Sequence, residues 1–250
     1  MLKCFRIANR GGFPLIILDT MDGNFYLFLM RDIPYNKYVD YALLKPTATP
    51  QEIIKGCKEA IKHEFMSFFV PPGYVNLAAG NLKNTSIKVG TVIGFPLGYT
   101  DSKTKIYEAQ QAVKNGAHEL DIVIQIGWAK AGEYNKVAKE ITSLRKNLPK
   151  YIILKAILEL VYFFLPEKEN LILALKDTPV DFLKTSTSFG PGGATIKDVK
   201  LMKRLVGREK GIKAAGGIKD ASTFIQMINA GATRIGTSSG PLIMQELWKS

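Results

Sequence analysis

Three lysines recur at equal spacing within otherwise apolar segments. Lys155 lies in "IILKAILE", Lys184 in "DFLKTST" and Lys213 in "GIKAAGG", with 29 residues from each to the next. An ammonium that is partly desolvated and lies beside another ammonium favours loss of a proton, so a crowded lysine can become a neutral nucleophile. A neutral amine can attack a carbonyl to form a Schiff base, which acts as an electron sink for making or breaking an adjacent C–C bond. The residue types therefore favour aldol chemistry without a metal.

A carboxylate accompanies the lysines. Asp121 in "HELDIVI" could carry protons during such a reaction, and it could pair with Lys155 or Lys213 and hold either one charged. The alternative is that these charged residues form an ion-pair network that only fills the interior. Residue types alone leave both interpretations open.

Short apolar segments alternate with helical patterns from residue 38 onward, which is typical of β/α units and a parallel sheet. Eight strands are predicted, at 38–44, 65–70, 89–95, 119–124, 151–159, 181–187, 211–217 and 233–239. Eight such units predict an α/β protein, a single-domain TIM (β/α)8 barrel over 37–250 with a short N-terminal extension over 1–36. An open doubly wound sheet is the alternative, but the sequence has no glycine-rich phosphate loop after the first strand.

Capping signals mark the ends of the predicted helices. Thr49 is a plausible N-cap, with Pro50 in the first turn and Glu52 in a capping box. In "TDSKTKIYEAQQAVKNG", Asp101 or Ser102 can cap the first turn and Gly116 can end the last.

Glycines and serines follow the last two predicted strands. "KAAGGIK" contains Gly216 and Gly217, and "RIGTSSG" contains Gly236, Ser238 and Ser239 at the start of a short helix. A glycine pair alone more often marks a tight turn. At these two strands, however, TIM barrels commonly bind phosphate, so we expect a phosphate site here.

The composition of the chain limits the kinds of partner that we expect. The net charge of +12 could attract nucleic acid, but the lysines are spread along predicted helices and no nucleic-acid module is present, so we expect a small phosphorylated substrate instead. We expect no membrane association, because no uncharged apolar run reaches about 18 residues. Cys4 and Cys57 form no C-x-x-C pair and His63 and His118 lack ligand spacing, so we expect no metal, no cofactor and a cytoplasmic location.

The first residues permit two interpretations. "MLKCFRIANRGG" is basic and acid-free, as in a transit peptide, or it belongs to an extension packed on the domain. The apolar residues in "FPLIILDTMDGNFYLFLM" could form an interface between copies in a homo-oligomer, or they could pack on their own barrel.

Six motifs together resemble the deoxyribose-phosphate aldolase family, whose members are class I aldolases with a TIM barrel. In chain order they are "TVIGFPLG", "EAQQAVKNGAHELDIVIQIG", "LKAILE", "DFLKTSTSFGPGGAT", "GIKAAGG" and "RIGTSSG". The resemblance spans roughly residues 38–240. It implies reversible cleavage of 2-deoxy-D-ribose 5-phosphate to acetaldehyde and D-glyceraldehyde 3-phosphate, and a homodimer or larger homo-oligomer.

The resemblance also implies a role for each charged residue. Lys184 matches the Schiff-base lysine, Lys213 the second lysine that perturbs it, and Asp121 the relay aspartate. Lys155 matches a supporting lysine, and Asp40 falls at a first-strand aspartate of the same network. The phosphate-binding positions of the family match Gly216, Gly217, Gly236, Ser238 and Ser239.

Some residues depart from the family pattern. Tyr41 and Ala42 replace a frequent His-Thr, "FFVPPGYV" lacks the usual cysteine and asparagine, Ser188 replaces a glycine and Gln125 an asparagine. These changes affect the rim of the expected pocket more than its lysines. Two alternatives therefore stay open, another Schiff-base barrel aldolase with a different aldehyde or keto acid substrate, and a barrel that has lost catalysis and acts as a binding protein.

Overall fold

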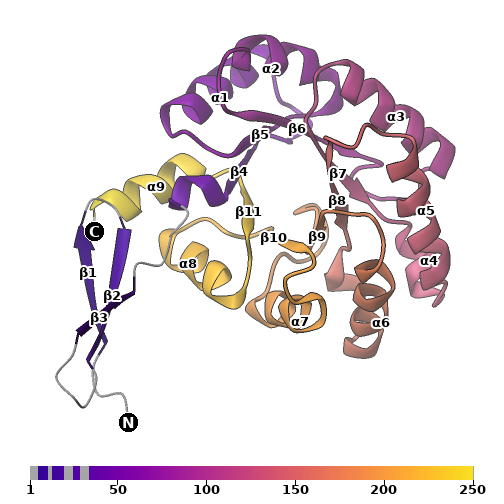
Figure 1. Cartoon of the computed structure of the whole chain (residues 1–250). Coiled ribbons are helices and arrows are strands. Elements are labelled where there is room, and N and C mark those ends of the chain that lie inside the picture. Colours follow the sequence, from indigo (N-terminus) through magenta and orange to yellow (C-terminus); the bar gives the residue numbers. More distant parts are fainter. Residues whose placement is uncertain (1–4, 11–12, 20–24, 29–33, 250) are drawn as a thin grey trace.

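Eight parallel strands close into a barrel, and helices surround it (Figure 1). The computed structural model describes residues 5–10, 13–19, 25–28 and 34–249. The strands follow one another around the barrel in the order β10-β11-β4-β5-β6-β7-β8-β9. This arrangement confirms the predicted TIM barrel, because each consecutive pair of strands is joined through a helical segment.

The eight barrel strands are β4 (Val39–Ala42), β5 (Ser67–Phe69), β6 (Lys88–Ile93), β7 (Glu119–Val123), β8 (Ile153–Ile157), β9 (Phe182–Lys184), β10 (Gly211–Ala215) and β11 (Arg234–Thr237). The helices are α1 (Pro50–Lys62), α2 (Val75–Leu82), α3 (Ser102–Lys114), α4 (Ile126–Lys130), α5 (Tyr134–Lys146), α6 (Leu165–Lys176), α7 (Ile196–Val206), α8 (Ala221–Ala230) and α9 (Gly240–Lys249). Short 3-10 helices are η1 (Tyr35–Tyr38), η2 (Pro72–Tyr74) and η3 (Leu160–Tyr162).

All eight predicted strands are present, but each is shorter than predicted. The segment 181–187 contains only the three residues of β9, for example. After Lys184 a side-chain bond joins the last backbone bonds: the N–H of Thr185 donates to the carbonyl of Lys213 at 3.1 Å, and the Thr185 hydroxyl accepts from the backbone N–H of Ala215 at 3.1 Å. The carboxyl ends of the strands thus turn early into the loops that form the barrel mouth.

The predicted helix ends are confirmed. The Thr49 hydroxyl accepts from the backbone N–H of Glu52 at 3.3 Å, and the Glu52 carboxylate accepts from the N–H of Thr49 at 2.9 Å. Asp101 caps α3 by accepting from the N–H of Lys103 at 2.9 Å. Gly116 follows the end of α3 with a φ of 102°, a left-handed conformation that favours glycine.

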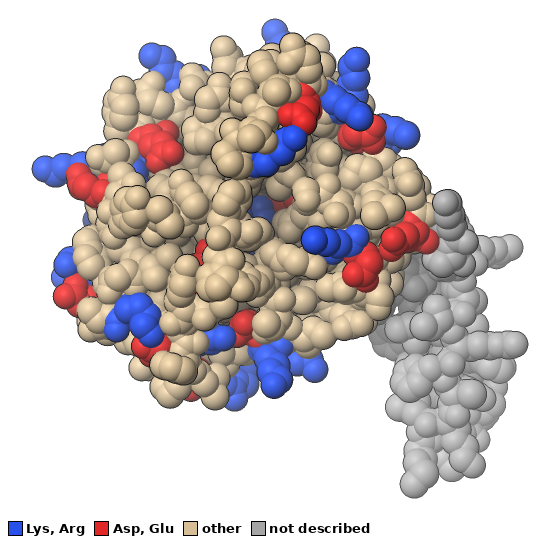
Figure 2. All heavy atoms as spheres, turned by 180° about the vertical axis from the view of Figure 1, so that it is seen from behind, with Lys and Arg blue, Asp and Glu red and all other residues tan. Residues whose placement is uncertain are grey.

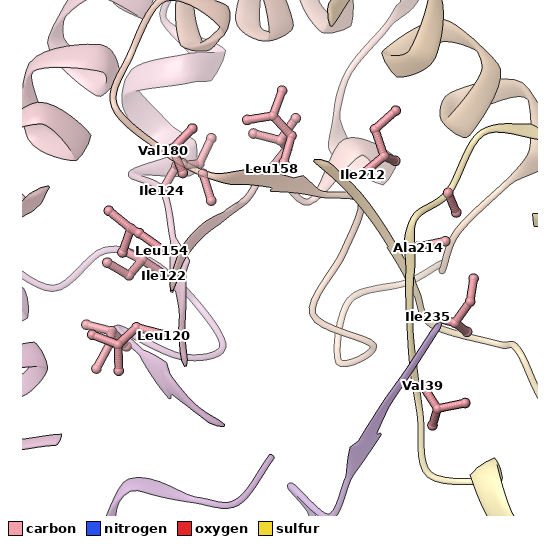
Figure 3. Close-up of a cluster of buried hydrophobic side chains, with 14 of the residues drawn as sticks. Val39, Leu120, Ile122, Ile124, Leu154, Leu158, Val180, Ile212, Ala214 and Ile235 are labelled. Atoms are coloured by element: carbon pink, nitrogen blue, oxygen red, sulfur yellow. The ribbon is translucent and has the colours of Figure 1, made fainter. Parts of the chain in front are cut away.

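Alternation along the strands separates an outer apolar layer from an inner charged one. The outer side chains point away from the barrel axis towards the helices (Figure 3), and include Val39, Leu120, Ile122, Leu154, Ile212 and Ile235. Because successive side chains of a strand face opposite ways, Asp121 between Leu120 and Ile122 faces the interior. The apolar layer fixes the register and thereby places the charged residues inside.

A separate antiparallel sheet precedes the barrel. It consists of β1 (Phe5–Arg10), β2 (Phe13–Asp19) and β3 (Phe25–Phe28), paired in that order. The proposed transit segment at 1–12 and the proposed interface segment at 13–30 lie partly outside the described residues. Neither expectation is tested.

Charges are dispersed on the face shown in Figure 2, where Lys and Arg side chains are interspersed with Asp and Glu. Within the described ranges, the helices are too short or too polar to cross a membrane.

Candidate active site

Lys184 and Lys213 lie side by side at the carboxyl end of the barrel. They are direct partners in the register between β9 and β10. Both Nζ atoms donate to the same oxygen of Asp121, Oδ2, each at 2.8 Å. Asp121 reaches them from β7, so this one carboxylate holds the two ammonium groups together.

Lys155 lies one layer below Lys184 and Lys213. It pairs with Phe182 rather than with Lys184, because the register between β8 and β9 is shifted by two residues. Its Nζ contacts Glu119, and lies 3.2 Å from Asp121 Oδ1 and 3.6 Å from Asp40 Oδ2. Equal spacing in sequence thus brings two amines into the mouth and leaves the third beneath them.

Asp40 connects the two layers from β4. Its Oδ2 lies 2.6 Å from Lys213 Nζ, and its Oδ1 accepts from Arg234 at 2.5 Å and from the Ser67 hydroxyl at 2.7 Å. Arg234 also lies 3.4 Å from Glu119. Asp40 therefore bridges the paired lysines above and the guanidinium below.

Sequence reasoning missed Glu119, Arg234 and Glu159. Glu119 and Arg234 are signalled by alternation, because they lie two residues before the inward-facing Asp121 and Gly236. Glu159 follows β8 with a left-handed φ of 50°, and its Oε2 accepts from the N–H of Thr187 at 3.0 Å. It anchors the loop that follows Lys184, and no sequence signal predicts this contact.

Burial and mutual charge set the protonation of the cluster. Burial raises the pKa of Asp121, but Lys155, Lys184 and Lys213 outweigh it and hold that pKa well below the usual range. Burial also lowers the pKa of Lys213, to about 8, with repulsion from Lys155 and Lys184 adding to it against attraction by Asp121 and Asp40. For Lys155, attraction by Asp121, Glu119 and Asp40 outweighs burial and raises the pKa. The mouth therefore holds an amine that loses its proton near neutral pH, above a lysine that stays charged.

A cavity of about 300 Å³ opens above the paired lysines. Lys184 and Lys213 form its base, with Phe69 beside them and Ser188 on the rim. Ser188 has a φ of 74°, an uncommon conformation for a residue other than glycine. A small carbonyl compound in the cavity can therefore meet a neutral amine that is hydrogen-bonded to Asp121.

The predicted phosphate residues divide into two groups. Gly236 and Ser238 line the cavity, and so does Lys45. Gly216 and Gly217 follow β10 at φ values of 97° and 78°, and Ser239 precedes α9, but in the described part of the chain these three are not among the lining residues.

A closed parallel barrel whose mouth holds two lysines around one carboxylate has the layout of a lysine-dependent aldolase. A sequence model described as DeoC/LacD family aldolase matches residues 37–250. The chain belongs to this family, and it is a class I aldolase.

Similar proteins cover most of the chain. A deoxyribose-phosphate aldolase of Thermoanaerobacter sp. (strain X514) is 48% identical over 212 residues, which are 84% of this chain and 95% of that protein. The solved structure "QR15, an Aldolase" has a TM-score of 0.83 at 38% identity and covers 87% of this chain and 97% of its own. The solved structure "Unique tetrameric structure of deoxyribose phosphate aldolase from Aeropyrum pernix" has a TM-score of 0.78 at 29% identity and covers 87% and 92%.

Proposed function

We propose that this enzyme reversibly cleaves 2-deoxy-D-ribose 5-phosphate to acetaldehyde and D-glyceraldehyde 3-phosphate through an imine on Lys184. The observation that carries the proposal is the shared Asp121 oxygen between Lys184 and Lys213 at the base of the cavity. The similarity to proteins named deoxyribose-phosphate aldolase supports this substrate.

The proposed reaction begins when neutral Lys184 attacks C1 of the open-chain sugar and water leaves. The protonated imine then accepts electrons as the C2–C3 bond breaks, while the C3 hydroxyl loses its proton to the network of Asp121 and Lys213. Glyceraldehyde 3-phosphate leaves first. Protonation of the enamine and hydrolysis of the imine release acetaldehyde and restore the amine.

Each residue of the network has a place in this scheme. Asp121 relays protons between the two mouth lysines, because it bonds both of them. Lys155 and Asp40 are supporting residues that hold Asp121 and Lys213 in position from below. The substrate phosphate binds at Gly236 and Ser238 on the cavity wall, with Gly216, Gly217 and Ser239 completing the site from the adjoining loops.

Borohydride reduction with substrate, followed by mass spectrometry, tests the proposal. We expect a substrate-dependent adduct on Lys184, product formation in a coupled assay, and loss of both in Lys184→Leu. Folded protein that forms no adduct with the sugar phosphate or with acetaldehyde would refute the imine. An adduct with other carbonyl compounds alone would instead indicate a different aldolase substrate.

We further propose a barrel domain over 37–250 preceded by an extension over 1–36, in a cytoplasmic homo-oligomer. The start of the family match at residue 37 supports the boundary. The related structure described as tetrameric supports assembly. Light scattering of the full chain measures the oligomeric state.

A further inference from the structure

Phe69 is the last residue of β5, and its ring lies against Lys213 of the mouth and Lys155 beneath it. The side chain is almost fully buried and lines the cavity. The ring centroid lies 3.6 Å from Lys213 Nζ and 4.6 Å from Lys155 Nζ. Lys184 has no comparable ring contact in the described part of the chain.

A glycine on the neighbouring strand makes room for this ring. Gly90 is the direct partner of Phe69 in the register between β5 and β6. A Cβ at Gly90 would lie 2.4 Å from Cζ of Phe69, a distance that real side chains do not reach. The ring therefore lies over the β6 backbone, in space that any side chain at Gly90 would occupy.

The two mouth lysines consequently differ in their surroundings. Lys213 is held by Asp40 at 2.6 Å, by Asp121 at 2.8 Å and by the face of the Phe69 ring. Of these three groups, only Asp121 contacts Lys184. An aromatic face attracts an ammonium, and more strongly where water is excluded. The ring therefore stabilises the charged form of Lys213 and covers one side of its Nζ.

We propose that Phe69 decides which mouth lysine forms the imine, because it keeps Lys213 charged and covered as a proton carrier and leaves Lys184 as the nucleophile. This inference rests on the proposed function. Without the ring, Lys213 would be neutral more often and open to a carbonyl carbon. Its Nζ would then attack the aldehyde, lose water and form a second imine.

The experiment traps imines with acetaldehyde and borohydride in a Lys184→Leu background, where Lys213 and Lys45 are the lysines that still line the cavity. Hydride from borohydride and a proton from water convert an imine to a stable alkyl-lysine, which mass spectrometry locates. We expect little adduct on Lys213 with Phe69 present and about tenfold more in Phe69→Leu. Phe69→Tyr keeps the aromatic face and should remain at the low level.

Phe68→Leu is the matched control. Phe68 is the neighbouring residue and equally buried, but it packs outwards against Gly56 and stacks on Tyr41 with a centroid distance of 5.3 Å. The substitution creates a similar packing defect without touching the lysines, so it should leave Lys213 unlabelled. Phe69→Met is a second test variant, because methionine removes the aromatic face but can fill the space that the ring leaves.

The pH dependence adds a readout that packing alone would not move. Because the ring favours the ammonium, its removal should lower the pKa of Lys213, so labelling of Lys213 should begin at lower pH in Phe69→Leu than with Phe69 present. Folded Phe69→Leu and Phe69→Met proteins that leave Lys213 unlabelled would overturn the inference, as would equal labelling in Phe68→Leu. Absence of an adduct on Lys184 in the unsubstituted protein would instead contradict the proposed function.

Discussion

Lys184 and Lys213 donate to one oxygen of Asp121, so the protonation of each amine depends on the other. A proton lost from Lys213 leaves a neutral amine that can take up the proton of Lys184 across this oxygen. In the proposed mechanism, the pair needs to lose only one proton for imine formation. Lys155 below them stays charged, because attraction by Asp121, Glu119 and Asp40 outweighs its burial.

The rate of imine formation should therefore depend on pH around 8. The pKa of Lys213 is lowered to about 8, so roughly a tenth of this amine is neutral at pH 7 and most of it above pH 8. We expect trapping with acetaldehyde and cyanoborohydride to rise about tenfold per pH unit below 8 and to level off above it. A profile that instead inflects near the value of free lysine would contradict this assignment. Lys184→Leu supplies the background rate.

At the scale of elements, the loop after β9 adopts an uncommon backbone conformation beside the site. Ser188 has a φ of 74° and lines the cavity, and the preceding Thr187 is anchored to Glu159. The left-handed conformation is unfavourable for residues other than glycine. The packing around Glu159 holds the loop in this form.

Ser188→Gly should relieve this strain and raise the free energy of unfolding by about 1 kcal/mol. Urea denaturation measures the change. Ser143→Gly is the control, because Ser143 lies within α5, where glycine should lower stability by about 0.5–1 kcal/mol. If both substitutions lower stability equally, the Ser188 conformation is not strained.

Sequence periodicity predicts the strands because their outer side chains are continuously apolar, as at Leu120 and Ile122. It does not predict strand register, which depends on how the closed barrel staggers its strands. The shift of two residues between β8 and β9 moves Lys155 below Lys184, whereas β9 and β10 pair Lys184 directly with Lys213. The sequence thus indicates which residues face inwards. The structure is needed to show which of them lie at the same height in the barrel.

At the scale of the whole molecule, the charged cluster joins strands from opposite sides of the barrel. In the described part of the chain it comprises four basic and three acidic side chains, Lys155, Lys184, Lys213, Arg234, Asp40, Glu119 and Asp121. Loss of one proton balances the charge, which agrees with the lowered pKa of Lys213. The lower layer, with Lys155, Arg234 and Glu119, pairs the buried charges beneath the two mouth lysines.

Glu119→Gln tests whether the lower layer of the cluster only stabilises the fold or also takes part in the chemistry. Glu119 is fully buried between Lys155 and Arg234, so losing its charge leaves two cations with less compensation. We expect the free energy of unfolding to fall by about 3 kcal/mol in chemical denaturation, while the folded fraction still forms the Lys184 adduct. Glu133→Gln removes the exposed partner of Lys136 and should change stability by less than about 1 kcal/mol. Unchanged stability with loss of the adduct would show that the lower layer takes part in the chemistry rather than supporting it.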